Sequence, residues 1–235
     1  MPPTPLDESP SCHSPCDTSE FTPSFLHAAI QFAPRASASE NLSAPVLLAI
    51  GRLVEKKGFP VLIEACRLLK DWGYQFQCQL ISGAGPCAQQ VASLIHELGL
   101  EGTVVMRPAV TQEELRQIYQ QATLFTLPCQ IAENNDRDGI PNVLVEAMAV
   151  GLPVVSTNIS GIPELVEHGV SGLLTPQKDA RALAEAIAEL LDTPALRQKL
   201  GSAAREKVCR LFDAESNILA LHRLFLDCLS GSELP

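Results

Sequence analysis

The sequence has few positive charges, no long apolar run and no signal peptide, and each absence excludes a class of protein. Its 235 residues contain 17 Lys and Arg against 27 Asp and Glu, a formal net charge of −10. A nucleic-acid-binding protein needs a basic face, so this balance argues against one. No apolar run approaches the ~18 residues of a membrane span, and the N-terminus lacks the basic start and apolar core of a signal peptide. Peripheral contact with a membrane stays open.

Cysteine is present, but not in the pattern of a disulfide framework. Six of the eight cysteines are scattered singly, as small core residues are in a reducing compartment, so we expect a cytoplasmic protein. The other two form Cys12-His13-x-x-Cys16, which offers three zinc ligands with His27 as a distant fourth. The motif lacks the second pair of ligands of a structural zinc site, and we predict no metal site.

Composition divides the chain into a leader and one domain. Residues 1–44 are rich in Pro, Ser, Thr and Ala and show no sustained period, which is typical of disorder. Short apolar runs then alternate with stretches of helical spacing. Strands alternating with helices of about 10–15 residues predict an α/β fold. We therefore expect a single Rossmann-like domain, with a doubly wound parallel sheet, over residues 45–230.

The predicted elements follow one another in strict alternation for most of this domain. The predicted strands are Val46–Ile50, Phe76–Ile81, Thr103–Met106, Thr123–Pro128, Pro153–Ser156 and Gly172–Leu174. The predicted helices are Phe59–Lys70, 89–98, one from a capping box at Thr111 to Gln121, one after Pro141, a short one opened by Gly161–Glu164, Asp179–Leu191, Pro194–Val208 and Ala214–Leu229.

The most informative stretch runs from Asp138 to Thr157. Proline is favoured at the first helical position and glycine just past the end, so Pro141 and Gly151 predict a helix of about ten residues between them. Predicted strands on either side complete a βαβ unit. Its ligand would lie outside the carboxyl end of the first strand, over the N-terminus of the helix.

Two carboxylates stand out in this unit. Glu146 is the only charge on an otherwise apolar helix, where it is costly unless something hydrogen-bonds it, and Asn142 lies four residues earlier on the same face. Asp138 precedes the helix, eight residues ahead of Glu146, so both carboxylates can face one ligand across the helix start. The alternative is that Asp138 caps the helix and Glu146 is solvated.

A cluster of cations follows the first predicted strand. The segment Gly51-Arg52-Leu-Val-Glu-Lys56-Lys57-Gly58 combines a glycine turn with cations ahead of a helix, as anion sites do. It lacks the Lys-Ser/Thr ending of a P-loop, so we do not predict one. The alternative is a set of solvated surface cations.

Glycines after the second predicted strand raise a dehydrogenase alternative. Gly83, Gly85 and Ala88 fit the G-x-G-x-x-A pattern of dinucleotide-binding proteins, which expects an acidic residue at the end of the next strand. That strand ends in Arg107 instead, and the glycines follow the second strand rather than the first. We therefore do not favour hydride transfer; a 2′-phosphate on Arg107 is the one variant left open.

The stretch from Asp138 to Val155 resembles the E-x7-E signature of retaining family 4 glycosyltransferases. It consists of an acid at position 138, seven residues, Glu146 and then Ala-Met-Ala-Val-Gly-Leu-Pro-Val-Val. These two-domain GT-B enzymes take sugar from a nucleotide diphosphate donor. Asp136-Arg-Asp-Gly-Ile-Pro141 resembles the branch with colanic-acid and other exopolysaccharide enzymes. The resemblance covers about Pro45 to Phe225, the donor-binding C-terminal half, with Asp138 in place of the wider family's first Glu.

The resemblance implies roles for the candidate residues. Glu146 would accept hydrogen bonds from ribose, and Asp138 would orient the sugar ring; these two form the catalytic pair. The residues expected at the diphosphate and sugar are Arg52, Lys57, Gly139, Ile140, Pro141 and Asn142, and those expected near the base are Arg107 and Pro108. The nucleotide sugar is a substrate, so no cofactor and no metal is implied.

The segment His27–Arg35 resembles the linker between the two halves of these enzymes. We therefore expect the N-terminal acceptor domain to be missing, and the isolated chain to bind a nucleotide sugar without transferring it. The alternatives to an enzyme are a non-catalytic nucleotide-sugar-binding remnant and a subunit that needs a separate N-terminal partner.

Overall fold

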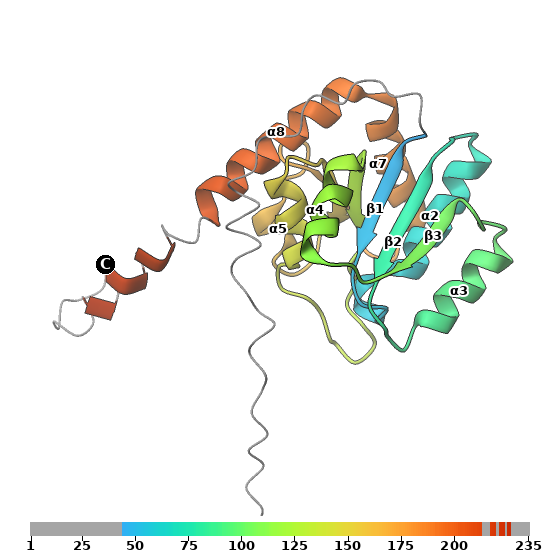
Figure 1. The fold of residues 1–235 in the computed structure, drawn as a ribbon, viewed down its shortest axis with the longest axis horizontal. Coiled ribbons are helices and arrows are strands. Elements are labelled where there is room, and N and C mark those ends of the chain that lie inside the picture. The colour runs from blue at the N-terminus through green and yellow to red at the C-terminus, as the bar shows by residue number, and fades with distance from the viewer. Residues whose placement is uncertain (1–43, 213–216, 220, 224, 227–235) are drawn as a thin grey trace, which may run out of the picture.

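The computed structural model describes residues 44–212, 217–219, 221–223 and 225–226, and Figure 1 shows their arrangement. The predicted leader lies outside these residues except for its last position. The Cys12–Cys16 motif, His27 and the segment resembling a linker also lie outside them. The predicted helix over Ala214–Leu229 is described only in pieces, which are helical.

Six parallel strands form one sheet in the order β3-β2-β1-β4-β5-β6. The strands are β1 (Val46–Ile50), β2 (Gln77–Ser82), β3 (Val104–Pro108), β4 (Leu124–Leu127), β5 (Val154–Thr157) and β6 (Leu173–Thr175). The chain moves outward from β1 to β3, returns to β4 beside β1, and then moves outward the other way. Open α/β sheets bind ligands at such a reversal, beyond the carboxyl ends of the strands. The predicted doubly wound, Rossmann-like sheet is confirmed.

Helices cover both faces of the sheet. They are the 3-10 turn η2 (Glu55–Lys57), α2 (Phe59–Asp71), α3 (Ala88–Glu97), α4 (Gln112–Gln121), α5 (Asn142–Ala149), α6 (Ile162–Leu165), α7 (Ala180–Asp192) and α8 (Pro194–Leu211). Helix α2 packs on α7 and α3, while α4 and α5 lie on the opposite face and α8 packs on α5 (Figure 1). Strands covered on both faces are mostly apolar, and β4 and β5 are buried throughout, with hydroxyl side chains at Thr126, Ser156 and Thr157.

Most predicted bounds agree with the structure within one or two residues, and the capping box at Thr111 is present. The start of α5 is a correction. Pro141 has φ −66° and an extended ψ of 125°, so it is the N-cap residue and Asn142 is the first helical residue. Helix α5 therefore has 8 residues rather than about ten. Helix α8 also continues to Leu211, beyond the predicted end at Val208.

Gly58 joins η2 to α2 and brings this turn against the end of β4. Its φ is +65°, in the left-handed region, and a Cβ added there would lie 1.9 Å from the carbonyl oxygen of Pro128. Both the left-handed backbone conformation and the close contact with Pro128 therefore require glycine at position 58. The same contact holds the loop after β1 against the loop after β4.

We expect Gly58→Ala to destabilise the fold by about 2–5 kcal/mol, because left-handed strain and a backbone clash add. Gly99→Ala is the matched control, since Gly99 has φ +60° and an added Cβ there would meet nothing within 4 Å. It should cost only the strain, about 1–2 kcal/mol. Urea denaturation of both variants measures the difference, and equal losses would contradict the packing argument.

Candidate functional site

The loop after β1 and the loop after β4 are fastened together at the carboxyl edge of the sheet, at the reversal of strand order. The Gln130 N–H donates to the Lys56 carbonyl at 2.9 Å, and the Glu133 N–H donates to Glu55 Oε1 at 3.0 Å. These two bonds place the cations of η2 beside the acidic segment that precedes α5. The Ile131 N–H donates to Gln177 Oε1 at 2.8 Å, which joins the loop after β4 to the segment after β6 as well.

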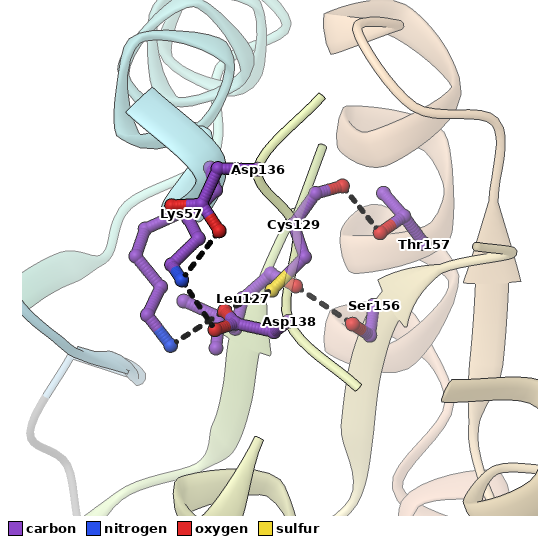
Figure 2. A network of polar contacts seen from close by, with 8 residues as sticks. Lys57, Leu127, Cys129, Asp136, Asp138, Ser156 and Thr157 are labelled. Carbon is purple, nitrogen blue, oxygen red and sulfur yellow. Dashed lines mark hydrogen bonds and ion pairs between the residues drawn. The ribbon is translucent and has the colours of Figure 1, made fainter. Parts of the chain in front are cut away.

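Two lysines and two aspartates form a charge cluster between these loops (Figure 2). Lys57 Nζ lies 2.8 Å from Asp138 Oδ2, and Lys56 Nζ lies 3.4 Å from Asp138 Oδ1 and 3.0 Å from Asp136 Oδ1. The Lys57 and Asp138 side chains are only 12% and 18% exposed. The hydrogen bond to Asp136 is the main cause of a raised pKa at Lys56, and the charge of Asp138 adds to it.

The Asp138 carboxylate lies where the two ammonium groups converge, which is the arrangement that a phosphate oxygen would need. Lys57 was predicted at such a site; Lys56 was not, although it stands next to it in the sequence. Arg52 is exposed on the same loop near Gly83, and it forms no ion pair with any residue that the structure describes. The sequence therefore identified the loop, but not the pairing of its cations with Asp138.

Cys129 lies beside Asp138 at the beginning of the same loop. Its Sγ is 3.8 Å from Asp138 Oδ2, and burial, with Asp138 adding and Lys57 opposing, raises the pKa of the thiol to about 12. Thr157 Oγ1 donates to the Cys129 carbonyl at 2.6 Å, and Ser156 Oγ donates to the Leu127 carbonyl at 2.7 Å (Figure 2). Buried hydroxyls of β5 thus fix the start of the loop, and Cys129 is a neutral packing residue.

The residues leading into α5 leave its first turn open. Ile140 packs on Gly161, where an added Cβ would lie 2.9 Å from Ile140 Cγ1. Gly139 is exposed with nothing within 4 Å of an added Cβ, and Asn142 is exposed at the first helical position. No side chain of the described residues caps α5. Its first N–H groups are therefore available to an anion.

Glu146 is hydrogen-bonded by Tyr119 of α4, not by Asn142. The Tyr119 hydroxyl lies 2.9 Å from Glu146 Oε2, and Tyr119 is fully buried. Burial raises the pKa of Glu146, while the hydrogen bond from Tyr119 opposes that rise. Tyr119 was not predicted as a site residue, although a tyrosine on the apolar face of a capped helix needs a partner for its hydroxyl.

We expect Glu146→Gln to stabilise the folded protein at neutral pH. The pKa of Glu146 is raised in the fold above its ordinary 4.5, so the folded state favours the protonated form. Its contribution to stability is therefore present at low pH and lost as pH rises through the folded pKa. The variant should melt higher than the wild type at about pH 7.5, and the gap should close toward about pH 4. Melting curves across this range test it, and a lower melting temperature at neutral pH would contradict it.

Arg107 and Pro108 are the last residues of β3. Register pairs Ile50 with Ile81 and Ile81 with Arg107, so these ends are level across three strands. Two strand spacings put Arg107 about 10 Å from β1 along the sheet edge. Both residues are exposed at the same edge as the charge cluster. Their contact with a base stays a prediction.

The glycine-rich turn after β2 packs on the protein itself. A Cβ added to Gly85 would lie 2.2 Å from the Leu53 carbonyl oxygen, which also accepts from the Cys87 N–H at 2.9 Å. Close contact between the two loops therefore accounts for Gly85 without a dinucleotide.

The described residues contain neither a membrane-spanning helix nor a cluster of metal ligands. None of their helices is both long and apolar enough to cross a membrane. Within the same residues, no group of three or more His, Cys, Asp or Glu side chains is placed to hold a metal ion.

Comparison with known proteins gives a consistent result. Residues 32–207 match the family described as glycosyl transferases group 1. The chain is 42% identical over 172 residues to a protein of Salmonella typhimurium named as the colanic acid biosynthesis glycosyltransferase WcaL, covering 72% of this chain and 42% of the relative. It is 46% identical over 162 residues to the amylovoran biosynthesis glycosyltransferase AmsK of Erwinia amylovora, covering 69% and 40%. The chain thus spans about two fifths of the length of these relatives.

Solved structures of glycosyltransferases share the fold. A sucrose-phosphate synthase from Thermosynechococcus elongatus superposes with a TM-score of 0.71 at 29% identity, covering 81% of this chain and 47% of that one. Anabaena HepE in complex with UDP and glucose superposes with a TM-score of 0.66 at 25% identity, covering 89% and 53%.

Proposed function

Because the chain belongs to the group 1 glycosyl transferases, a family of enzymes, we propose that its described domain binds the donor of a retaining hexosyl transfer. The donor is a nucleotide diphosphate sugar, and the acceptor is a saccharide or a lipid-linked saccharide. The names of the colanic acid and amylovoran relatives support polysaccharide biosynthesis. The observation that carries the proposal is the convergence of Lys56 and Lys57 on Asp138, beside the open start of α5.

The diphosphate takes the place that Asp138 holds between the two lysines. Departure of a nucleoside diphosphate builds negative charge on its phosphates, and preorganised positive groups stabilise that charge. Lys56, Lys57 and the first N–H groups of α5 supply such groups, and Arg52 extends the same loop. In this proposal they do so without a metal ion.

The two acidic residues have separate roles. Glu146 accepts hydrogen bonds from the ribose hydroxyls. Asp138, once displaced from the lysines, orients the sugar ring through its hydroxyls and shields positive charge that develops at the anomeric carbon. Gly139–Asn142 line the diphosphate and the sugar, and Arg107 and Pro108 lie toward the base. Retaining glycoside hydrolases instead use a carboxylate as nucleophile, which is not proposed here.

Transfer also needs an acceptor held against the donor with water excluded. We propose that this surface lies outside residues 44–212, on another domain or on a separate N-terminal partner. We also propose a cytoplasmic location. The described cysteines Cys66, Cys78, Cys87, Cys129 and Cys209 are free thiols, which agrees with a reducing compartment.

A thermal-shift panel of UDP-, GDP- and ADP-sugars tests donor binding. We expect one nucleotide class to raise the melting temperature, equally with and without EDTA. A panel without any shift, repeated by calorimetry, would refute the proposal; a shift abolished by EDTA would refute metal independence. A radiolabelled-donor assay with membrane extract as acceptor then separates an active enzyme, which forms product alone, from a donor-binding subunit or remnant.

A further inference from the structure

The Glu146 carboxylate is held through one oxygen by one side chain. The Tyr119 hydroxyl lies 2.9 Å from Glu146 Oε2 and 3.3 Å from the Val143 carbonyl oxygen. No other hydrogen bond to this carboxylate is found among the residues that the structure describes. Tyr119 is itself rigidly placed, because it is fully buried and its ring packs at a 42° tilt on Phe125 of β4, with centroids 6.0 Å apart.

The Tyr119 hydroxyl has one hydrogen, and among the described residues two acceptors lie within its reach. The carboxylate is the nearer of the two acceptors and, when ionised, the stronger one, so it receives the hydrogen bond. Val143 alone could have satisfied the hydroxyl. Burying a carboxylate costs free energy unless its oxygens are hydrogen-bonded. Because Tyr119 fixes one oxygen of Glu146, the other oxygen, Oε1, has a defined position in which it can accept a hydrogen bond from a ligand.

We infer that Tyr119 is a positioning residue, which holds the Glu146 carboxylate in the orientation that receives the ribose hydroxyls of the donor. The inference rests on the ribose contact proposed above for Glu146. Tyr119 does not touch the ligand; it acts through Glu146, by fixing that side chain before the donor binds, which reduces the ordering required on binding.

The test compares ribose with deoxyribose ligands. Calorimetry gives the affinities for GDP and dGDP, and for UDP and dUDP, in the wild type, Tyr119→Phe, Glu146→Gln and Tyr74→Phe. The last variant is a matched control, because the exposed Tyr74 hydroxyl donates to Asp192 at 2.6 Å away from the site. Wild type and Tyr74→Phe should prefer the ribose form, and this preference should fall about tenfold in Tyr119→Phe, the change that 1.4 kcal/mol produces.

The outcomes separate the inference from the proposed function. If Tyr119→Phe keeps the full preference while Glu146→Gln loses it, the ribose contact stands and the role of Tyr119 is overturned. If the wild type binds both forms equally, the ribose contact itself fails, and the inference fails with it. A general loss of affinity for all four ligands in Tyr119→Phe, with the preference unchanged, would indicate a purely structural role.

A second measurement keeps the inference testable if Tyr119→Phe does not fold. The sequence contains two tyrosines, so Tyr74→Phe leaves Tyr119 as the only one. With ¹³C at the tyrosine Cζ, its resonance reports the hydrogen bond of the hydroxyl. We expect the chemical shift of the Tyr119 resonance to change when Glu146→Gln is added to the Tyr74→Phe protein, and to change again when GDP binds. A resonance unchanged by both would overturn the inference.

Discussion

The Asp138→Asn variant is expected to bind free nucleoside diphosphate about tenfold more tightly than the wild type. For the sugar nucleotide, we expect no such increase in affinity. In the unliganded structure the Asp138 carboxylate lies 2.8 Å from Lys57 Nζ and 3.4 Å from Lys56 Nζ, where we propose the diphosphate binds. A neutral amide competes less for these cations, and charge-assisted bonds of this kind are worth about 1.5–3 kcal/mol. The sugar nucleotide would also lose the contact that we propose between Asp138 and the sugar ring.

Calorimetry with UDP, GDP and their sugar forms gives the ratio of the two affinities. Asp136→Asn is the control, because among the described residues the Asp136 carboxylate pairs only with Lys56, and its side chain is 53% exposed. That variant should change diphosphate affinity by no more than about twofold, as exposed ion pairs contribute little. Weaker diphosphate binding in a folded Asp138→Asn protein would contradict the idea that Asp138 and the diphosphate share one place.

Replacing both lysines of η2 is expected to have the largest effect on binding. Lys56→Ala with Lys57→Ala should lower nucleoside diphosphate affinity about hundredfold, since two charge-assisted contacts of about 1.5 kcal/mol or more each are lost. Affinity for the free nucleoside should stay within about twofold, because the nucleoside carries no phosphate. Arg52→Ala should act in the same direction more weakly, since Arg52 is exposed.

Lys70→Ala is the matched control for this experiment. Lys70 is exposed, and its Nζ donates to the Gly99 carbonyl at 2.7 Å, away from the site. Diphosphate binding by the wild type should also weaken with added salt, as contacts between charges do. Loss of Lys57 leaves Asp138 without its closest partner, so melting curves must accompany the titrations. Equal losses for nucleoside and diphosphate would mean that the lysines are structural.

The order of strands and helices could be predicted because strands buried on both faces of a sheet are continuous apolar runs in the sequence. Val46–Ile50 is predicted and observed with the same bounds, since a strand covered on both sides must be apolar throughout. The capping box at Thr111 is equally local and is confirmed. Pro141 was placed wrongly because a proline fixes φ alone. Its φ of −66° suits a helix, but the preceding loop sets ψ to 125°.

At the candidate site, the sequence could point to several of the residues that the structure brings together, but not to their pairings. Arg52, Lys57, Asp138 and Glu146 stand in recognisable local patterns, and the fold brings the first three to one edge of the sheet. The bond of Lys56 with Asp136 joins residues 80 apart, and that of Tyr119 with Glu146 joins residues 27 apart. Periodicity describes which face a residue lies on, but not which side chain it meets there. Helical spacing predicted Asn142 as the neighbour of Glu146, whereas in the folded structure Tyr119 of another helix forms the hydrogen bond with Glu146.

The most direct test of the proposed donor site is an assigned amide NMR spectrum of the chain, titrated with the diphosphate of the nucleotide that binds in the panel. We expect the largest shifts at the residues around the charge cluster and the start of α5, which are Gly51, Lys57, Gly58, Gly139 and Asn142. An open groove between α3 and β3, lined by Ala92, Ile95, Gly102, Val105 and Met106, serves as the competing location. Shifts confined to that groove, with the loop residues unmoved, would contradict the account.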